Sequence, residues 1–238
     1  MEKNECEKLL KDYCSSNGIF CDENILSNFY RYYQILVREN EKYNLTNITE
    51  IQDVYVKHFI DCIELSKYIK DNASICDIGT GAGFPGLVLK IVRPDLEVVL
   101  VDSLNKRVNF LNMVINELKL EKVVALHFRA EDVEFKNKYL NSFDYVVSRA
   151  VAKLNTLLEY CLPYVKVGGE FLAMKGSDVS SELAEIVEAH KKLGGEKMEF
   201  VAYSLFDMKR AIVRVNKCKL TDKKYPRSQN KARISPLK

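Results

Sequence analysis

Residues 74–86 read Ser-Ile-Cys-Asp-Ile-Gly-Thr-Gly-Ala-Gly-Phe-Pro-Gly. The apolar start of this stretch predicts a buried strand, and the four glycines after it predict a loop. A helical pattern follows, with Pro85 at its first position and Pro94 beyond its end. Strand, glycine loop and helix form the unit in which a nucleotide-like ligand approaches bare backbone at a helix N-terminus. We therefore predict a nucleoside site here.

An acidic residue follows at the spacing that such a site needs. Residues 97–102, Glu-Val-Val-Leu-Val-Asp, predict a second strand that ends in Asp102. A carboxylate about 20 residues beyond the glycines, at the end of a strand, suits hydrogen bonding to ribose hydroxyls. Asp102 is therefore the candidate ligand for a ribose.

The glycines alone do not decide which nucleoside is bound. Gly81, Gly83 and Gly86 satisfy the dinucleotide pattern G-x-G-x-x-G, which is a weak signal by itself. Asp77 extends it to Asp-x-Gly-x-Gly-x-Gly, which resembles motif I of class I S-adenosylmethionine-dependent methyltransferases. A carboxylate there disfavours a pyrophosphate and favours the cationic sulfonium and amino groups of S-adenosylmethionine. A methyl donor is therefore preferred, with NAD, or a loop that only makes a tight turn, as alternatives.

Strands and helices alternate after the glycine loop. We predict helices over 105–118, 153–162 and 178–193, and strands over 122–128, 143–147, 170–174, 197–205 and 211–215, the last two as a hairpin around 207–210. This order predicts an α/β fold with a doubly wound parallel sheet, whose ligand lies across the carboxyl ends of the strands. The residues at those ends are Gly79, Asp102, Ala130, Glu131 and Arg149.

The first 70 residues predict a helical extension. Residues 1–42 and 54–68 have helical character, and the first segment has an apolar stripe of Leu26, Phe29, Tyr30, Tyr33, Leu36 and Val37. At this spacing the tyrosines are expected in the core rather than against nucleic-acid bases. His58 is either a structural residue or one that acts in catalysis or phosphate binding. We predict an extension over 1–70, a core over 71–217 and a tail over 218–238 within one structural domain.

The charge of the chain is uneven. The net charge is +3, but residues 217–238 carry eight Lys or Arg and one Asp, so they hold +7 and the remainder about −4. Such asymmetry indicates a polyanionic partner, and a merely solvated tail is the alternative.

The seven cysteines are odd in number, without Cys-x-x-Cys or clustered His, which disfavours a disulfide framework or a zinc site. No signal peptide and no apolar run of about 18 residues is seen, so we expect a cytoplasmic protein without a membrane partner.

Several motifs together resemble the RsmG family, also called GidB, of bacterial 16S rRNA guanine-N7 methyltransferases. They are Asp-Ile-Gly-Thr-Gly-Ala-Gly-Phe-Pro-Gly (77–86), Val-Asp-Ser-Leu-Asn-Lys-Arg (101–107), Arg-Ala-Glu-Asp (129–132), Ser-Arg-Ala-Val-Ala (148–152) and Tyr-Pro-Arg (225–227), with similar pieces at 43–48 and 58–61. The resemblance implies a class I methyltransferase fold with a Rossmann-like, mostly parallel seven-stranded sheet. It implies methyl transfer from S-adenosylmethionine to N7 of one guanine in 16S rRNA. By resemblance, the donor contacts are Gly79, Phe84, Ala130, Glu131 and Arg149.

The chemistry of that reaction agrees with the residues present. Guanine N7 has a free lone pair, so the enzyme needs proximity and in-line orientation more than a general base. Residues 148–151 stand where aminopurine methylation favours an Asn-Pro-Pro-Tyr-type loop, and no Pro-Cys pair offers a nucleophile for cytosine. We expect Arg149 to lie between donor and RNA, paired with a carboxylate or phosphate; a structural salt bridge is the alternative.

The basic tail supplies the expected RNA contacts. The candidates for phosphate binding are Lys223, Lys224, Arg227, Lys231 and Arg233, with Tyr225 as a stacking face and Lys209-Arg210 as an extension of that surface. The acceptor that the resemblance implies is 16S rRNA, as naked RNA, a 30S subunit or an assembly intermediate, and nothing demands more than a monomer. Competing interpretations are a methyltransferase of this fold acting on another RNA, a protein or a small molecule, an NAD-dependent oxidoreductase, and a non-catalytic rRNA-binding factor.

Overall fold

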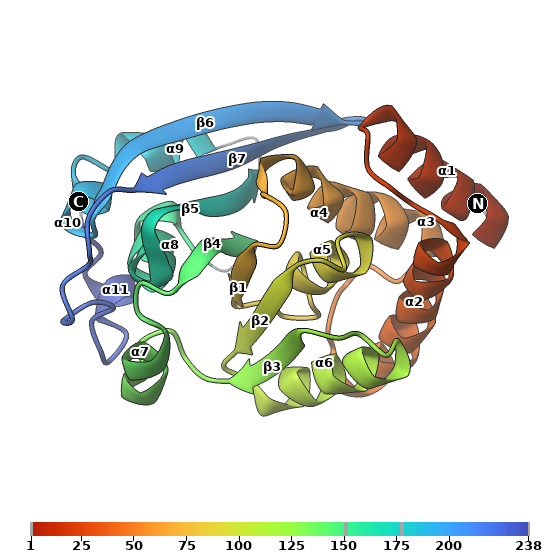
Figure 1. Ribbon diagram of the computed structural model, residues 1–238, viewed down its shortest axis with the longest axis horizontal. Helices are drawn as coiled ribbons and strands as arrows, with labels where there is room; N and C mark the ends of the chain where they lie inside the picture. Colours follow the sequence, from red (N-terminus) through yellow and green to blue (C-terminus); the bar gives the residue numbers. More distant parts are fainter. Residues whose placement is uncertain (1, 150–151, 177–178, 238) are drawn as a thin grey trace. The chain divides into compact units, whose positions relative to one another are not determined.

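The computed structural model describes residues 2–149, 152–176 and 179–237 (Figure 1). Its seven strands form a mostly parallel sheet in the order β3-β2-β1-β4-β5-β7-β6, which confirms the predicted fold class. The strands are β1 (Ser74–Ile78), β2 (Glu97–Asp102), β3 (Val123–His127), β4 (Phe143–Arg149), β5 (Val165–Gly176), β6 (Gly195–Leu205) and β7 (Met208–Lys217).

The helices confirm most of the predicted pattern. They are α1 (Lys3–Ser16), α2 (Glu23–Tyr43), α3 (Ile51–Val54), α4 (Asp61–Ile63), α5 (Gly86–Val92), α6 (Asn105–Glu117), α7 (Val133–Tyr139), α8 (Leu154–Cys161), α9 (Val179–Ala184), α10 (Ala189–Lys192) and α11 (Lys231–Ile234). A π-helical stretch, Tyr55–Ile60, joins α3 to α4, and 3₁₀ turns cover Glu64–Tyr68 and Leu162–Tyr164. Among the described residues, none of these helices combines the length and apolar character that a bilayer crossing requires.

The chain forms two compact units. The first holds the chain up to residue 72 together with residues 80–127, and the second holds residues 73–79 and the chain from residue 128 onward. The domain boundaries at residues 70 and 217 stay a prediction.

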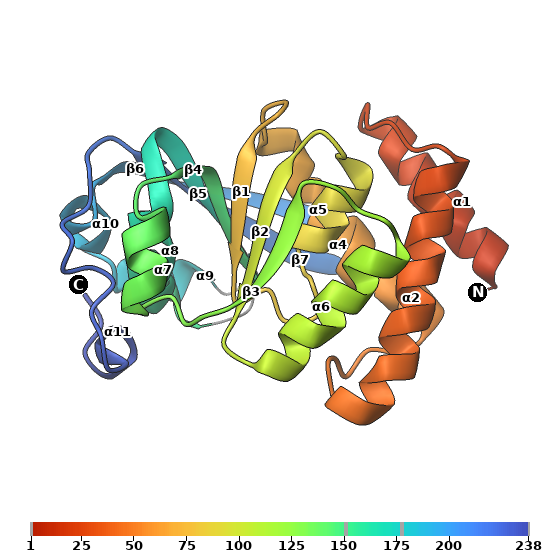
Figure 2. The same cartoon turned by 60° about the horizontal axis from the view of Figure 1, so that its bottom comes forward.

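The long helix α2 organises the first unit. Its N-terminus is capped by the Asp22 carboxylate, which accepts a hydrogen bond from the Ile25 amide at 2.9 Å. It ends at Asn44, whose left-handed backbone (φ 49°) stops the helix. Figure 2 shows α2 alongside α5 and α6.

The apolar stripe predicted for this helix was partly wrong: the buried face carries Tyr32 and Ile35, and Tyr30, Tyr33 and Val37 are only half-buried. The difference arises because the Tyr32 ring packs against Phe59.

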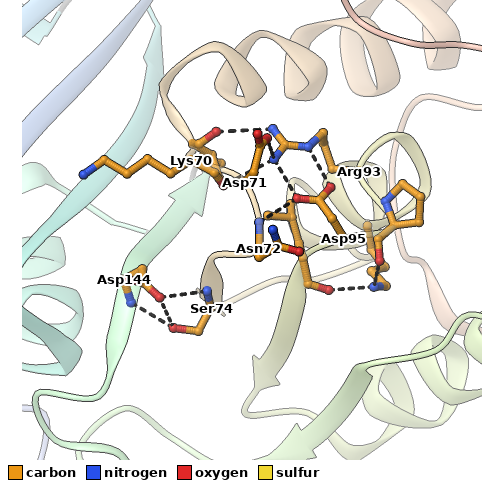
Figure 3. A network of polar contacts seen from close by, with 11 residues as sticks. Lys70, Asp71, Asn72, Ser74, Arg93, Asp95 and Asp144 are labelled. Atoms are coloured by element: carbon orange, nitrogen blue, oxygen red, sulfur yellow. Dashed lines mark hydrogen bonds and ion pairs between the residues drawn. The ribbon is translucent and has the colours of Figure 1, made fainter.

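A network around Arg93 secures the segment that precedes β1 in the chain (Figure 3). The Arg93 guanidinium donates to both carboxylate oxygens of Asp95, to Asp71, and to the carbonyls of Ile69 and Lys70. The neighbouring guanidinium lowers the pKa of Asp95 to about 2.

Figure 3 also shows a separate network within the second unit. There the Asp144 carboxylate accepts from the Ser74 amide and hydroxyl at 2.9 and 2.6 Å. This second network fixes the first residue of β1.

Parallel pairing builds the second unit. Asp77 on β1 lies opposite Val147 on β4, and Arg149 at the end of β4 lies opposite Met174 on β5. The hairpin of β6 and β7 then adds antiparallel strands through β7. In Figure 1, α8 lies beside β4 and β5, and α11 lies beside α8.

Five details of the predicted elements were wrong. The helix after the glycine loop begins at Gly86, because Pro85 is its N-cap residue. The strand predicted over 170–174 begins earlier, at Val165, so Gly168-Gly169 lie inside β5. A Cβ on Gly169 would come within 2.4 Å of the Asp144 carbonyl oxygen, so a close strand contact explains that glycine. The hairpin turn is Phe206-Asp207, which places Lys209-Arg210 in β7.

The other two differences concern helices. α7 was not predicted, because only Phe135 of its seven residues is buried and its apolar periodicity is weak. The predicted helix over 178–193 is two short helices, α9 and α10, although no Gly or Pro marks the break; Asp178 lies outside the described residues.

Candidate functional site

The glycine loop follows β1 and is closed by its own backbone. The Thr80 amide donates to the Val101 carbonyl at 3.1 Å, and the Thr80 carbonyl accepts from the amides of Gly83 and Phe84 at 2.9 Å each. Gly83 has φ +98°, and a Cβ there would lie 2.6 Å from both Leu87 Cδ1 and Tyr32 Oη, so only glycine fits. A Cβ on Gly81, by contrast, would meet no atom within 4 Å, so the backbone of Gly81 borders open space that a ligand can approach.

Asp102 lies against this loop. Its carboxylate is 2% exposed and accepts from the Gly81 amide and the Leu104 amide, both at 2.9 Å. Arg107 Nη1 lies 3.3 Å from the same carboxylate. A carboxylate has about four lone-pair sites, so three contacts leave capacity for one further donor. Asp102 therefore fixes the loop backbone and keeps an acceptor site of the kind that a ribose hydroxyl uses.

The side chain of Phe84 faces the aromatic core of the first unit. Phe84 is 6% exposed, and its ring centroid lies 4.4 Å from that of His58 and 5.8 Å from that of Tyr32. A donor can therefore reach Phe84 through its backbone rather than across its ring. The His58 ring is itself engaged: Nε2 lies 3.0 Å from Thr46 Oγ1, and Nδ1 lies 3.1 Å from the Lys57 carbonyl oxygen. These contacts indicate a structural role for His58, as a support for the Phe84 ring.

Sequence reasoning missed Tyr32 as a site residue. Its buried hydroxyl donates to the Ala82 carbonyl, so α2 supports the glycine loop directly. The two residues are 50 positions apart, and an aromatic stripe on a helix gives no sign of which ring reaches the loop.

In the second unit, the end of β4 is joined to the end of β1. The Ser148 hydroxyl donates to the Ile78 carbonyl at 2.9 Å. This bond places Arg149, the last residue of β4, beside the strand that leads into the glycines, and Gly79 follows with φ +73°. The predicted motif continues through Ala150 and Val151, which lie outside the described residues.

The predicted adenine-side pair, Ala130-Glu131, is held by its neighbours. The Tyr164 hydroxyl donates to the Ala130 carbonyl, and burial raises the pKa of Tyr164 well above its usual range. Arg129 Nε lies 3.3 Å from Glu131 Oε1, and Arg129 Nη2 donates to Asn230 Oδ1 at 2.9 Å. Both members of the pair are buried.

The basic tail divides into exposed and anchored residues. We call Lys223, Lys224, Lys231 and Arg233 the exposed tail cations, since all four are exposed. Tyr225 is 8% exposed, so the expected stacking face is wrong: the ring packs into the protein instead. Arg227 is bound to Glu159, and Lys217 is buried and adds nothing to the surface charge. Of the two cations proposed to extend this surface, Lys209 is exposed and Arg210 is half-buried.

Metal binding has no candidate in the part of the chain that the structure describes. There, no group of three or more His, Cys, Asp or Glu residues is placed to hold a metal ion. The arrangement instead offers bare loop backbone, buried carboxylates and exposed cations, which suit a nucleoside and a polyanion.

Comparison with known proteins agrees with this arrangement. The sequence pattern of the GidB family, described as rRNA small subunit methyltransferase G, matches residues 25–213. A protein of Clostridium tetani named ribosomal RNA small subunit methyltransferase G is 46% identical over 97% of this chain and 98% of its own length. Another of that name from Lachnoclostridium phytofermentans is 47% identical over 93% of each chain. Among solved structures, a SAM-dependent methyltransferase from Aquifex aeolicus has a TM-score of 0.52 and 16% identity, covering 68% of this chain and 92% of its own, which supports the fold.

Proposed function

This chain belongs to the GidB family, rRNA small subunit methyltransferase G, and we propose on that premise that it methylates N7 of one guanine in 16S rRNA with S-adenosylmethionine as donor. The proposal agrees with the contact between the Gly81 amide and the Asp102 carboxylate. That contact joins the glycine loop to the acid at the end of β2, the two parts that a nucleoside site of this type needs. We further propose that the protein acts in the cytoplasm as a monomer.

We propose that the donor binds to the glycine loop, to Asp102 and to the Ala130-Glu131 pair. The backbone of residues 79–84 holds the methionine part, with its open side at Gly81. The remaining lone pair of Asp102 accepts from a ribose hydroxyl. Ala130 and Glu131 flank the adenine. Tyr164 holds the Ala130 carbonyl in position, and Arg129 holds the Glu131 carboxylate.

The reaction needs no general base. The N7 lone pair attacks the methyl carbon, the carbon–sulfur bond breaks, and its electron pair returns to sulfur, leaving S-adenosylhomocysteine and a cationic N7-methylguanine. No proton has to be removed from N7, so the enzyme accelerates transfer by holding donor and guanine in line. Arg149, at the end of β4, is the proposed positioning residue between donor and RNA.

The acceptor is proposed to be held through its phosphates. The exposed tail cations can each neutralise a phosphate, which gives affinity without reading sequence. Position, rather than base recognition by the tail, then selects the guanine.

The test is methyl transfer from labelled S-adenosylmethionine to 30S subunits that lack their N7-methylguanine. The modified nucleotide is then mapped by strand cleavage at N7-methylated sites. We expect label at one guanine of 16S rRNA. Donor binding without any label in rRNA would refute the proposed acceptor, and absence of donor binding would refute the donor site.

A further inference from the structure

An ion pair between the half-buried Arg227 and the buried Glu159 joins the basic tail to α8. The Arg227 amide and Nε both donate to Glu159 Oε1 at 2.8 Å, and Arg227 Nη2 donates to Glu159 Oε2 at 2.6 Å. Arg227 Nη2 also donates to the Ser235 carbonyl at 2.8 Å. Glu159 is fully buried, and removing one partner of such a pair leaves the other charge uncompensated. The Glu159 carboxylate raises the pKa of Arg227, which keeps the guanidinium charged.

The tail is folded around this pair rather than loose. Pro226 accepts from Lys136 Nζ at 3.1 Å through its carbonyl, and Asn230 accepts from Arg129. The Ala232 carbonyl accepts from the buried Thr156 hydroxyl of α8 at 3.2 Å. Residues 225–235 therefore have a defined course across α8 and the 129–136 segment.

The exposed tail cations lie on both sides of Arg227 in the chain. Lys223 and Lys224 precede it, and Lys231 and Arg233 follow it within α11. Arg227 itself uses its Nε and Nη2 groups for bonds within the protein. It is thus poorly available for a phosphate, but it is placed to hold its cationic neighbours in fixed positions.

We propose that Glu159 and Arg227 are positioning residues for rRNA: their ion pair fixes the tail so that the exposed tail cations meet several phosphates together. The inference rests on the proposed function, because it needs the tail to bind RNA. For a neutral substitution of Glu159, a positioning role and simple electrostatics predict opposite changes in RNA affinity. Neutralising Glu159 removes a negative charge next to a polyanion site, which by charge alone strengthens RNA binding. A positioning role makes the same change weaken it.

The experiment measures binding of a 16S rRNA transcript between about 50 and 200 mM salt, for the full chain and its variants. Glu159→Gln removes the acceptor charge, Arg227→Lys keeps the cation but loses the bidentate geometry, and Lys231→Ala removes one exposed cation as a matched control. S-adenosylhomocysteine titration and thermal unfolding are recorded for each protein.

We expect Lys231→Ala to lower the salt slope by about 0.7–0.9, the value of one phosphate contact. Glu159→Gln and Arg227→Lys should each lower it by about 2 or more and weaken binding at least about tenfold, because several cations lose their positions together. S-adenosylhomocysteine affinity should be unchanged. With 30S subunits lacking the modification, KM for the subunit should rise while kcat at saturation and KM for the donor stay the same.

Two results would overturn the inference. In the first, Arg227→Lys binds the rRNA transcript like the unmodified protein, and Arg227→Ala lowers the salt slope by the value of one phosphate contact. Arg227 would then be an ordinary phosphate ligand. The other is unchanged or tighter binding by Glu159→Gln. Should Glu159→Gln fail to fold, the milder Arg227→Lys decides alone. Unchanged binding by Lys231→Ala and by Lys223→Ala/Lys224→Ala would instead refute RNA binding by the tail, which belongs to the proposed function and not to the ion pair.

Discussion

The buried lysine at the root of the tail makes stability depend on pH in a defined way. Lys217 is 2% exposed, and its Nζ donates to the Leu162 carbonyl at 2.7 Å and to the Thr221 hydroxyl, both neutral acceptors. Burial lowers the pKa of Lys217 from 10.5 to about 7. Since one pKa unit corresponds to about 1.36 kcal/mol, holding the charged form in the folded protein costs up to about 5 kcal/mol.

The sign follows from proton binding. Between about pH 7 and 10.5 the unfolded chain keeps the Lys217 proton that the folded protein releases, so the free energy of unfolding rises with pH. Below about pH 7 both states are protonated and the dependence disappears. From pH 6 to pH 9, this lysine alone should raise the free energy of unfolding by about 2.5 kcal/mol.

The assay is urea unfolding at pH 6, 7.5 and 9 for the unmodified protein, Lys217→Met and Lys219→Met. The last is a matched control, because Lys219 is exposed two residues away. Taking differences between proteins removes the groups that titrate in all of them. We expect the stability of Lys217→Met, relative to the unmodified protein, to fall by about 2.5 kcal/mol between pH 6 and 9, and Lys219→Met to keep the unmodified profile. Parallel profiles for Lys217→Met and the unmodified protein would show that the reasoning is wrong.

Three further changes test the first unit. In Gly83→Ala, the alanine has to take up a positive φ and contact Leu87, a strain of about 1–3 kcal/mol. S-adenosylhomocysteine should therefore bind roughly tenfold to hundredfold more weakly by calorimetry, and unchanged affinity would contradict the loop geometry. Asp102→Asn puts an amide where the Gly81 amide needs an acceptor and should also weaken S-adenosylhomocysteine, whereas equal binding in that titration would remove Asp102 from the site. Arg93→Ala should lower the free energy of unfolding by about 2–3 kcal/mol in urea, with Arg93→Lys no better, and a loss under about 0.5 kcal/mol would deny the network a stabilising role.

Local patterns predicted the strand, glycine loop and helix, and the second strand ending in Asp102. Both could be recognised because their signals lie in short stretches: an apolar run, glycines that recur directly after it, and an acid at a fixed spacing. The contact between Gly81 and Asp102 follows from the same pattern, since parallel strands end at one edge of a sheet.

Partners far apart in the chain could not be predicted. Arg227 and Glu159 are 68 residues apart, and as letters in a basic tail Arg227 looks no different from Lys223. Tyr225 was expected on the surface for the same reason, since its burial depends on how the tail packs rather than on its neighbours in sequence. Likewise, the break between α9 and α10 has no Gly or Pro to mark it.

The anchoring of Phe84 in the helical extension has a consequence for modularity. The Phe84 ring at the end of the glycine loop stays out of solvent because His58 and Tyr32 pack against it, and Tyr32 also holds the Ala82 carbonyl. A fragment trimmed to the strands and helices common to this fold would expose that ring and release the loop. Moving the proposed donor site into another protein therefore requires α2 and the segment around His58 to be moved with it.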